Sequence, residues 1–162
     1  MKQILFIRHA KSSWEYDVSD IDRPLNSRGL NDANLMSNHF KSYKIRPDMV
    51  FSSPANRALT TCKIFLKTLN IDENRLVIDS NLYDFGGQMV IDFIKSVDDT
   101  HSCIMIFGHN HAFTTLVNEL GDQFIGNLPT CGLAKIDFDT DQWSKINKEH
   151  TDMLLFPKEL KS

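Results

Sequence analysis

Residues 4–9, Ile-Leu-Phe-Ile-Arg-His, join a continuous apolar run to an arginine and a histidine. A short uninterrupted run of this kind predicts a strand that is buried on both faces, as in a parallel sheet covered by helices. Arg8 and His9 are then expected at the carboxyl end of that strand. Ligands of open α/β sheets bind beyond the carboxyl ends of the strands. The stretch therefore predicts a fold class together with the position of a site.

Two further segments have the same form. The apolar run 103–107 is followed by a glycine and a histidine, and the strand predicted at 49–51 leads into Ser-Ser-Pro-Ala-Asn-Arg-Ala at 52–58, which opens a helix. Three strand ends of one sheet would bring two arginines and two histidines together: Arg8, His9, Arg57 and His109. Such a group is an anion pocket that contains a nucleophile, as phosphoryl transfer through a phosphohistidine requires.

The rest of the chain alternates strand and helix patterns. Helices are expected from about 26–41, 54–69, 89–97 and 112–120. Strands are expected at 2–7, 49–51, 75–78, 103–107 and 133–138, with weaker candidates at 143–147 and 153–156. Residues 11–24 and 81–88 are expected to form loops. This alternation predicts one α/β domain over 1–162 with a largely parallel sheet.

Bulk properties exclude several classes of protein. The 162 residues carry a net charge of −3, which argues against a nucleic-acid binder. Three cysteines without a Cys-x-x-Cys spacing argue against a disulfide framework and a zinc site. No apolar stretch reaches the roughly 18 residues of a membrane span, and the first residues enter a strand pattern without the layout of a signal peptide. We therefore expect a cytoplasmic protein that binds no membrane, and its oligomeric state stays open.

Four segments together carry a family resemblance: residues 7–14, 22–29, 52–61 and 108–110. In this order they resemble the histidine phosphatase superfamily, also called phosphoglycerate mutase-like, and more closely its small SixA-like phosphohistidine phosphatase branch. The resemblance implies a three-layer α/β/α histidine phosphatase fold. It also implies that His9 is the phosphorylated nucleophile, that Arg8, Arg57 and His109 bind the phosphoryl oxygens, and that Arg23 lies near the pocket.

The chain departs from the family pattern where many members carry a general acid. Those members have a glutamate in a Leu-x-Glu phrase, and here the phrase is Leu82-Tyr83-Asp84. Asp84 is the candidate acid, although its side chain is one methylene shorter and it also suits an ordinary loop turn. A second departure is His111, where the SixA-like branch often has proline.

The chemistry of the pocket favours a phosphorus–nitrogen bond. A neutral histidine attacks phosphorus, and neighbouring arginines favour the neutral ring by lowering a pKa that is ordinarily about 6.5. The arginines also neutralise the phosphoryl oxygens, so neither a metal ion nor another cofactor is expected. A phosphohistidine ring can leave as neutral imidazole after protonation by solvent, whereas an alkoxide needs an acid from the enzyme.

The surroundings of the pocket leave alternatives open. Lys11 and Asn110 are candidate substrate-binding residues, and Lys11 with Ser12 and Trp14 forms a substrate rim or fixes the loop. Arg23 alternatively pairs with a nearby aspartate. The first hypothesis is a metal-independent phosphatase of a phosphohistidine protein. The second is a phosphatase of small phosphate esters that uses the same site, and the third is a phosphate-binding or interaction module without catalysis.

Overall fold

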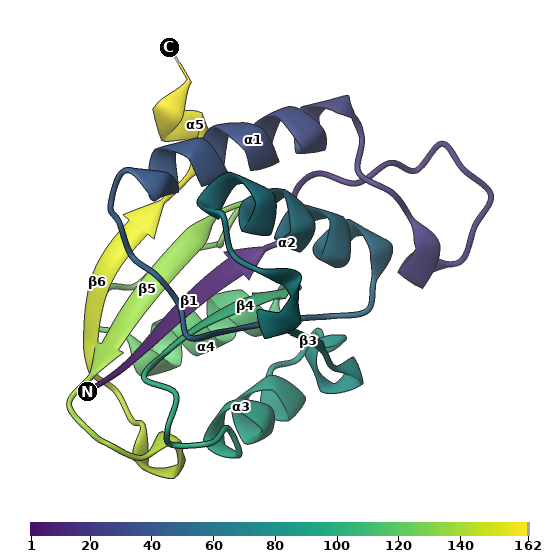
Figure 1. Cartoon of the computed structure of the whole chain (residues 1–162). Helices are drawn as coiled ribbons and strands as arrows, with labels where there is room; N and C mark the ends of the chain where they lie inside the picture. Colours follow the sequence, from purple (N-terminus) through teal and green to yellow (C-terminus); the bar gives the residue numbers. More distant parts are fainter. Residues whose placement is uncertain (162) are drawn as a thin grey trace.

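The computed structural model describes residues 1–161 and contains a six-stranded sheet in the order β3-β2-β4-β1-β5-β6 (Figure 1). The first four strands in sequence are parallel, β5 is antiparallel to β1, and β6 is antiparallel to β5. The largely parallel sheet is therefore confirmed. Its strands are β1 (Lys2–Arg8), β2 (Met49–Ser52), β3 (Leu76–Ile78), β4 (Cys103–Gly108), β5 (Leu133–Phe138) and β6 (His150–Leu155).

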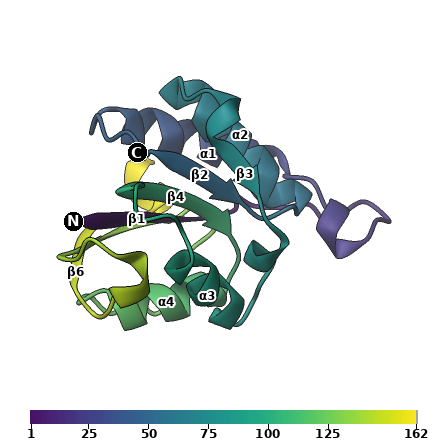
Figure 2. The same ribbon diagram turned by 60° about the horizontal axis from the view of Figure 1, so that its bottom comes forward.

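Helices cover both faces of the sheet, which confirms the three-layer α/β/α fold (Figure 2). One face packs against α1 and α2, and the opposite face packs against α3 and α4. Each face of the sheet has its own hydrophobic core, and consecutive β1 residues point into opposite cores. Leu5 packs on the side of α1 and α2, and Phe6 packs on the side of α3 and α4. The helices are α1 (Ser27–Lys41), α2 (Asn56–Leu69), α3 (Gln88–Lys95), α4 (Ala112–Leu120) and α5 (Pro157–Leu160). Among residues 1–161, no helix is long and apolar enough to cross a bilayer.

Three sequence predictions were wrong in detail. The strand expected at 153–156 begins three residues earlier, at His150. The weak strand at 143–147 is instead a 3-10 helix, Trp143–Lys145, because the indole of Trp143 is fully buried and donates from Nε1 to the carbonyl oxygen of His101 at 2.9 Å. The helix expected from Pro54 begins two residues later, at Asn56, with Ala55 as its N-cap. None of these changes affects the ends of β1, β2 and β4, where the predicted site residues lie.

The register of the parallel strands brings the predicted site segments together. Arg8 pairs with Gly108, and the next residue, His9, donates its backbone N–H to the Gly108 carbonyl oxygen at 3.0 Å. On the other side of β4, Ser53 donates its N–H to the Phe107 carbonyl oxygen, also at 3.0 Å. The residues that leave β1, β2 and β4 are thus adjacent at one edge of the sheet.

The segment 11–24 is an irregular loop, as predicted, that is tied at both ends. Ser13 donates its backbone N–H to Pro24 at 2.8 Å, and Asn26 donates to the carbonyl oxygen of Lys11 at 3.0 Å. Asn26 also caps α1, because its side chain accepts from the Gly29 N–H at 2.8 Å. A single-turn 3-10 helix, Asp20–Asp22, lies within the loop.

Gly29 lets the first turn of α1 lie against the backbone of this loop. A β-carbon at position 29 would lie 2.1 Å from the Lys11 carbonyl oxygen, so the backbone itself would have to shift. We expect Gly29→Ala to lower the free energy of unfolding by about 1–3 kcal/mol, despite the better helix propensity of alanine. Denaturant unfolding measures this effect, with Asn31→Ala on the exposed side of α1 as the control. Equal stability of wild type and Gly29→Ala would contradict the close approach.

Candidate active site

His9 is held in the orientation that a nucleophile needs. It is 8% exposed, and its Nδ1 lies 2.7 Å from the carbonyl oxygen of Ala10. A carbonyl only accepts, so this contact assigns the ring proton to Nδ1 and leaves the lone pair on Nε2. Ala10 in turn donates its N–H to the Thr61 hydroxyl at 3.0 Å, and Thr61 donates to the Arg57 carbonyl oxygen at 2.7 Å. The first turns of α2 therefore fix the segment that orients His9.

The His9 ring is neutral at physiological pH. Burial lowers its pKa to about 3, and the charges of Arg57, Arg8 and Arg23 lower it as well, against the opposing effect of the Ala10 hydrogen bond. A histidine can attack phosphorus only as the unprotonated ring, so this environment keeps His9 in the form that a nucleophile requires.

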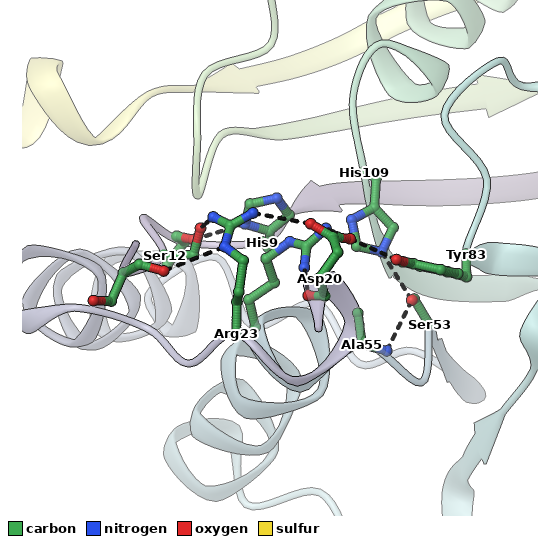
Figure 3. Close-up of polar contacts among 11 residues, drawn as sticks. His9, Ser12, Asp20, Arg23, Ser53, Ala55, Tyr83 and His109 are labelled. Atoms are coloured by element: carbon green, nitrogen blue, oxygen red, sulfur yellow. Dashed lines mark hydrogen bonds and ion pairs between the residues drawn. The ribbon is translucent and has the colours of Figure 1, made fainter. Parts of the chain in front are cut away.

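His109 lies beside His9, with ring centroids 5.3 Å apart, and is 1% exposed. Its Nε2 is 2.8 Å from the Ser53 hydroxyl oxygen, which accepts from the Ala55 N–H at 3.1 Å (Figure 3). When the Ser53 hydroxyl donates to Nε2, the ring proton of His109 lies on Nδ1. This Nδ1 is buried and has no hydrogen-bond partner within residues 1–161, so in that tautomer it is a free N–H donor.

His109 is also a neutral group. Burial lowers its pKa to about 3, and the neighbouring His9 and Arg57 contribute in the same direction. The structure therefore gives His109 a neutral ring, which donates one N–H from Nδ1 in the tautomer that accepts from Ser53.

Arg57, in the first turn of α2, is 3% exposed and is bound by Asp20 from the loop 11–24. Its Nη1 donates to the Asp20 backbone carbonyl at 2.6 Å, and its Nη2 donates to the Asp20 carboxylate at 3.0 Å. The same carboxylate accepts from Arg23 at 3.0 Å and from the Tyr83 hydroxyl at 2.5 Å. Partial burial raises the pKa of Asp20, but the donors Tyr83, Arg57 and Arg23 outweigh it and hold the pKa at about 2.

Arg23 and Arg8 complete the cationic group. Arg23 is 8% exposed and donates to the backbone carbonyl of Ser13 at 3.2 Å and to the Ser12 hydroxyl. The sequence analysis gave two positions for Arg23, near the pocket or paired with an aspartate. The structure shows both, because Arg23 lines the pocket and pairs with Asp20. Arg8 donates from Nη1 to the Leu128 carbonyl at 2.9 Å, and its buried Nε has no partner in the described part of the chain.

His9 and the three arginines line a cavity of about 260 Å³, whereas the buried ring of His109 lies behind His9 and is not among the lining residues. Its walls include Lys11 and Asn110, both candidates from the sequence, together with Trp14, Phe85 and Thr130. The Asn110 amide is partly engaged, since it donates to Asn127 at 2.6 Å. The cavity is also lined by Arg8, His9, Ser12, Asp20, Arg23 and Arg57.

Asp84 does not join this group, so the structure contradicts its expected place as the general acid. Its carboxylate accepts backbone N–H groups of the turn that starts α3, from Gly86, Gly87, Met89 and Val90, at 3.0–3.2 Å. A side chain that satisfies the free amides of a helix N-terminus acts as a cap. Residues 82–84 lead directly into the turn that starts α3, and in this turn the Asp84 side chain lies outside the cavity.

Three residues of the site were missed by the sequence reasoning: Asp20, Ser53 and Tyr83. Asp20 was considered only as a nearby aspartate that could pair with Arg23, and its contacts with Arg57 and Tyr83 were not expected. Ser53 was seen only as part of the segment before α2. Tyr83 carried no signal, because its hydroxyl meets Asp20 from 63 residues away.

The geometry defines a cationic cavity around a neutral, buried histidine. The family model of the histidine phosphatase superfamily (branch 1) matches residues 4–89, more than half of the chain. The chain therefore belongs to the histidine phosphatase superfamily. The uncharacterised protein Rv1276c of Mycobacterium tuberculosis is 31% identical over 138 residues, which cover 79% of this chain and 84% of that protein.

Solved structures identify the branch. The structure assigned as the phosphohistidine phosphatase SixA of Agrobacterium tumefaciens is 27% identical, with a TM-score of 0.75, and the match covers 84% of this chain and 91% of that one. The protein histidine phosphatase SixA complexed with tungstate has the same fold, with a TM-score of 0.83, 22% identity and coverage of 98% and 99%. This chain is accordingly a SixA-like phosphatase of the superfamily.

The buried histidines generate a prediction about pH. Both have folded-state pKa values near 3, below the value of about 6.5 expected for the unfolded chain. Their contribution to stability is therefore complete above about pH 6.5 and is lost as the pH falls toward 3. In the ligand-free protein, we expect side-chain NMR at pH 5 to find both rings neutral, with the proton on Nδ1. A charged His9 ring at pH 5 would contradict the assignment.

The position of Asp84 generates a second prediction. Asp84→Ala removes the acceptor of the α3 amides, so we expect it to lower the free energy of unfolding by about 0.5–2 kcal/mol. Because Asp84 lies outside the cavity, its loss is expected to reduce turnover of histidine and serine phosphates by the same factor. Asp92→Ala, within α3, is the control for charge. A selective loss on serine phosphate would restore Asp84 as an acid.

Proposed function

We propose that this phosphatase acts on phosphohistidine in a protein, through a phosphohistidine intermediate on His9. The observation that carries the proposal is the Nε2 lone pair of a neutral, buried His9 beside the guanidinium groups of Arg8 and Arg57. Such an arrangement supplies a nucleophile and the positive charge that a transferring phosphoryl group requires.

The proposed reaction has two displacements. Nε2 of His9 attacks phosphorus, and the bond from phosphorus to the leaving nitrogen breaks with its electron pair going to the leaving imidazole. That imidazole is protonated by solvent on its other nitrogen, so it departs neutral. Water then attacks the phosphorus on His9, which releases inorganic phosphate and a proton and regenerates the neutral ring. Arg8, Arg57 and the Nδ1–H of His109 would stabilise the phosphoryl oxygens in both steps.

The acidic groups of the site support a nitrogen leaving group. Among the described residues, Asp20 supplies the one carboxylate that lines the cavity, and its pKa of about 2 keeps it ionised. An ionised carboxylate cannot protonate a departing alkoxide. The imidazole leaving group has no such requirement, so histidine phosphates suit the site better than alkyl esters.

Trapping the intermediate tests the catalytic step. We expect wild type mixed with a ³²P-labelled phosphohistidine peptide to incorporate label that survives an alkaline denaturing quench, because the phosphorus–nitrogen bond of phosphohistidine is acid-labile. His9→Ala should incorporate none and lose at least about 10³-fold in turnover, since the nucleophile is gone. His39→Ala, on the far part of α1, is the control. Label on His9→Ala would eliminate the mechanism.

A comparison of substrates tests which class of phosphate compound the enzyme hydrolyses. Phosphohistidine and phosphoserine peptides of one sequence are assayed side by side, and we expect the higher kcat/KM on phosphohistidine. Faster turnover of phosphoserine or of small esters would select the ester phosphatase instead. Binding of phosphate without turnover of any substrate would select the non-catalytic module.

A further inference from the structure

Two large aromatic side chains are exposed at the mouth of the catalytic cavity. Trp14 is 76% exposed and Phe85 is 46% exposed, and both line the cavity that contains His9. They come from different loops, the segment 11–24 and the turn before α3. Exposed apolar rings that converge on one opening indicate a binding surface more than a chance placement.

Trp14 rests on an ordered cation. The guanidinium carbon of Arg23 lies 3.3 Å from the centroid of the indole ring, as in a cation–π contact. Arg23 is itself held by the backbone of Ser13 and by the carboxylate of Asp20. One face of the indole is therefore supported, while the ring stays largely open to solvent.

Phe85 is supported in a comparable way. Its ring centroid lies 5.2 Å from that of Tyr83 and 5.1 Å from that of His109. The Tyr83 hydroxyl is bound to the carboxylate of Asp20, which also binds Arg23 (Figure 3). One carboxylate thus connects the residue that supports Trp14 to a residue that supports Phe85.

We propose that Trp14 and Phe85 form a subsite that binds a flat aromatic leaving group by stacking. This inference rests on the proposed function. In an in-line displacement the leaving group lies opposite Nε2 of His9, and the opening of the cavity is where it has room. Aromatic rings stack face to face or edge to face with a gain beyond the area they bury. The imidazole of phosphohistidine and the phenol of phosphotyrosine share this shape.

Binding of inert phosphonates tests the subsite without turnover. The probes are phenylphosphonate and methylphosphonate, and calorimetry is expected to give about tenfold tighter binding of the phenyl compound to wild type. Trp14→Ala and Phe85→Leu should each reduce that preference several-fold, while Trp14→Phe, which keeps an aromatic ring, should retain most of it. Phe124→Ala removes an exposed aromatic side chain that does not line the cavity, so it should leave the preference unchanged.

Tryptophan emission reports the same contact directly. The second tryptophan, Trp143, is fully buried and bonded to His101, which precedes β4 at the opposite edge of the sheet. Phenylphosphonate should therefore change the emission of Trp14 alone, and Trp14→Phe should abolish the change. Equal binding of the two phosphonates to wild type, or a preference that survives both Trp14→Ala and Phe85→Leu, would overturn the proposal.

Turnover measurements distinguish the two possible aromatic leaving groups, the imidazole of phosphohistidine and the phenol of phosphotyrosine. On peptides of one sequence that carry phosphohistidine, phosphotyrosine or phosphoserine, Trp14→Ala should raise KM about tenfold for the two aromatic groups and less than about twofold for phosphoserine. The aromatic peptide with the higher kcat/KM identifies the leaving group. If wild type hydrolyses none of them yet prefers phenylphosphonate through Trp14, the proposed function fails and the subsite stands. If wild type hydrolyses none of the peptides and binds neither phosphonate, both fail; if it hydrolyses phosphohistidine without preferring phenylphosphonate, only the subsite fails.

Discussion

The parallel pairing of β1 with β4 is the constraint on which the site depends. Its register sets Arg8 opposite Gly108, so the residues that follow, His9 and His109, emerge side by side. Parallel ladders in a sheet covered on both faces tolerate no slip, since a shift of one residue would send every core side chain to the wrong layer. The packing of the apolar run 4–7 therefore fixes the distance between two polar rings that contribute little to the core themselves.

Placing these cations and histidines at one buried edge has an electrostatic cost, and the molecule offsets it in two ways. Both histidines give up their charge, chiefly because burial disfavours the protonated ring. Arg57 keeps its charge and is bound by Asp20, whose carboxylate also binds Arg23. In the proposed reaction, a phosphoryl group that enters the cavity would meet donors that are already oriented, and Asp20 supplies part of that orientation. Preorganised charge of this kind lowers the reorganisation that catalysis would otherwise require.

Much of this arrangement could be predicted from residues close together in the sequence. The apolar runs at 4–7 and 103–107 are short and uninterrupted, which identified buried parallel strands, and the residues after them identified His9 and His109. The ends of weak elements were harder: residues 143–147 carry no clear period, and burial of the Trp143 indole decided their 3-10 conformation. Asp84 was assigned to the cavity from a phrase of three residues, whereas the direction of its side chain depends on the turn into α3.

The sequence by itself determined the α/β class and the group of two arginines and two histidines, because strand period and strand ends are local properties of the chain. Only the tertiary structure decided which groups touch. Asp20 meets Arg57 and Tyr83 across 37 and 63 positions of the chain, and Trp14 and Phe85 reach one cavity from separate loops. Loop conformation is set by contacts with distant elements, and no local pattern encodes it. The position of the proposed nucleophile, His9, could therefore be predicted from the order of residues, whereas the walls that would hold its leaving group could not.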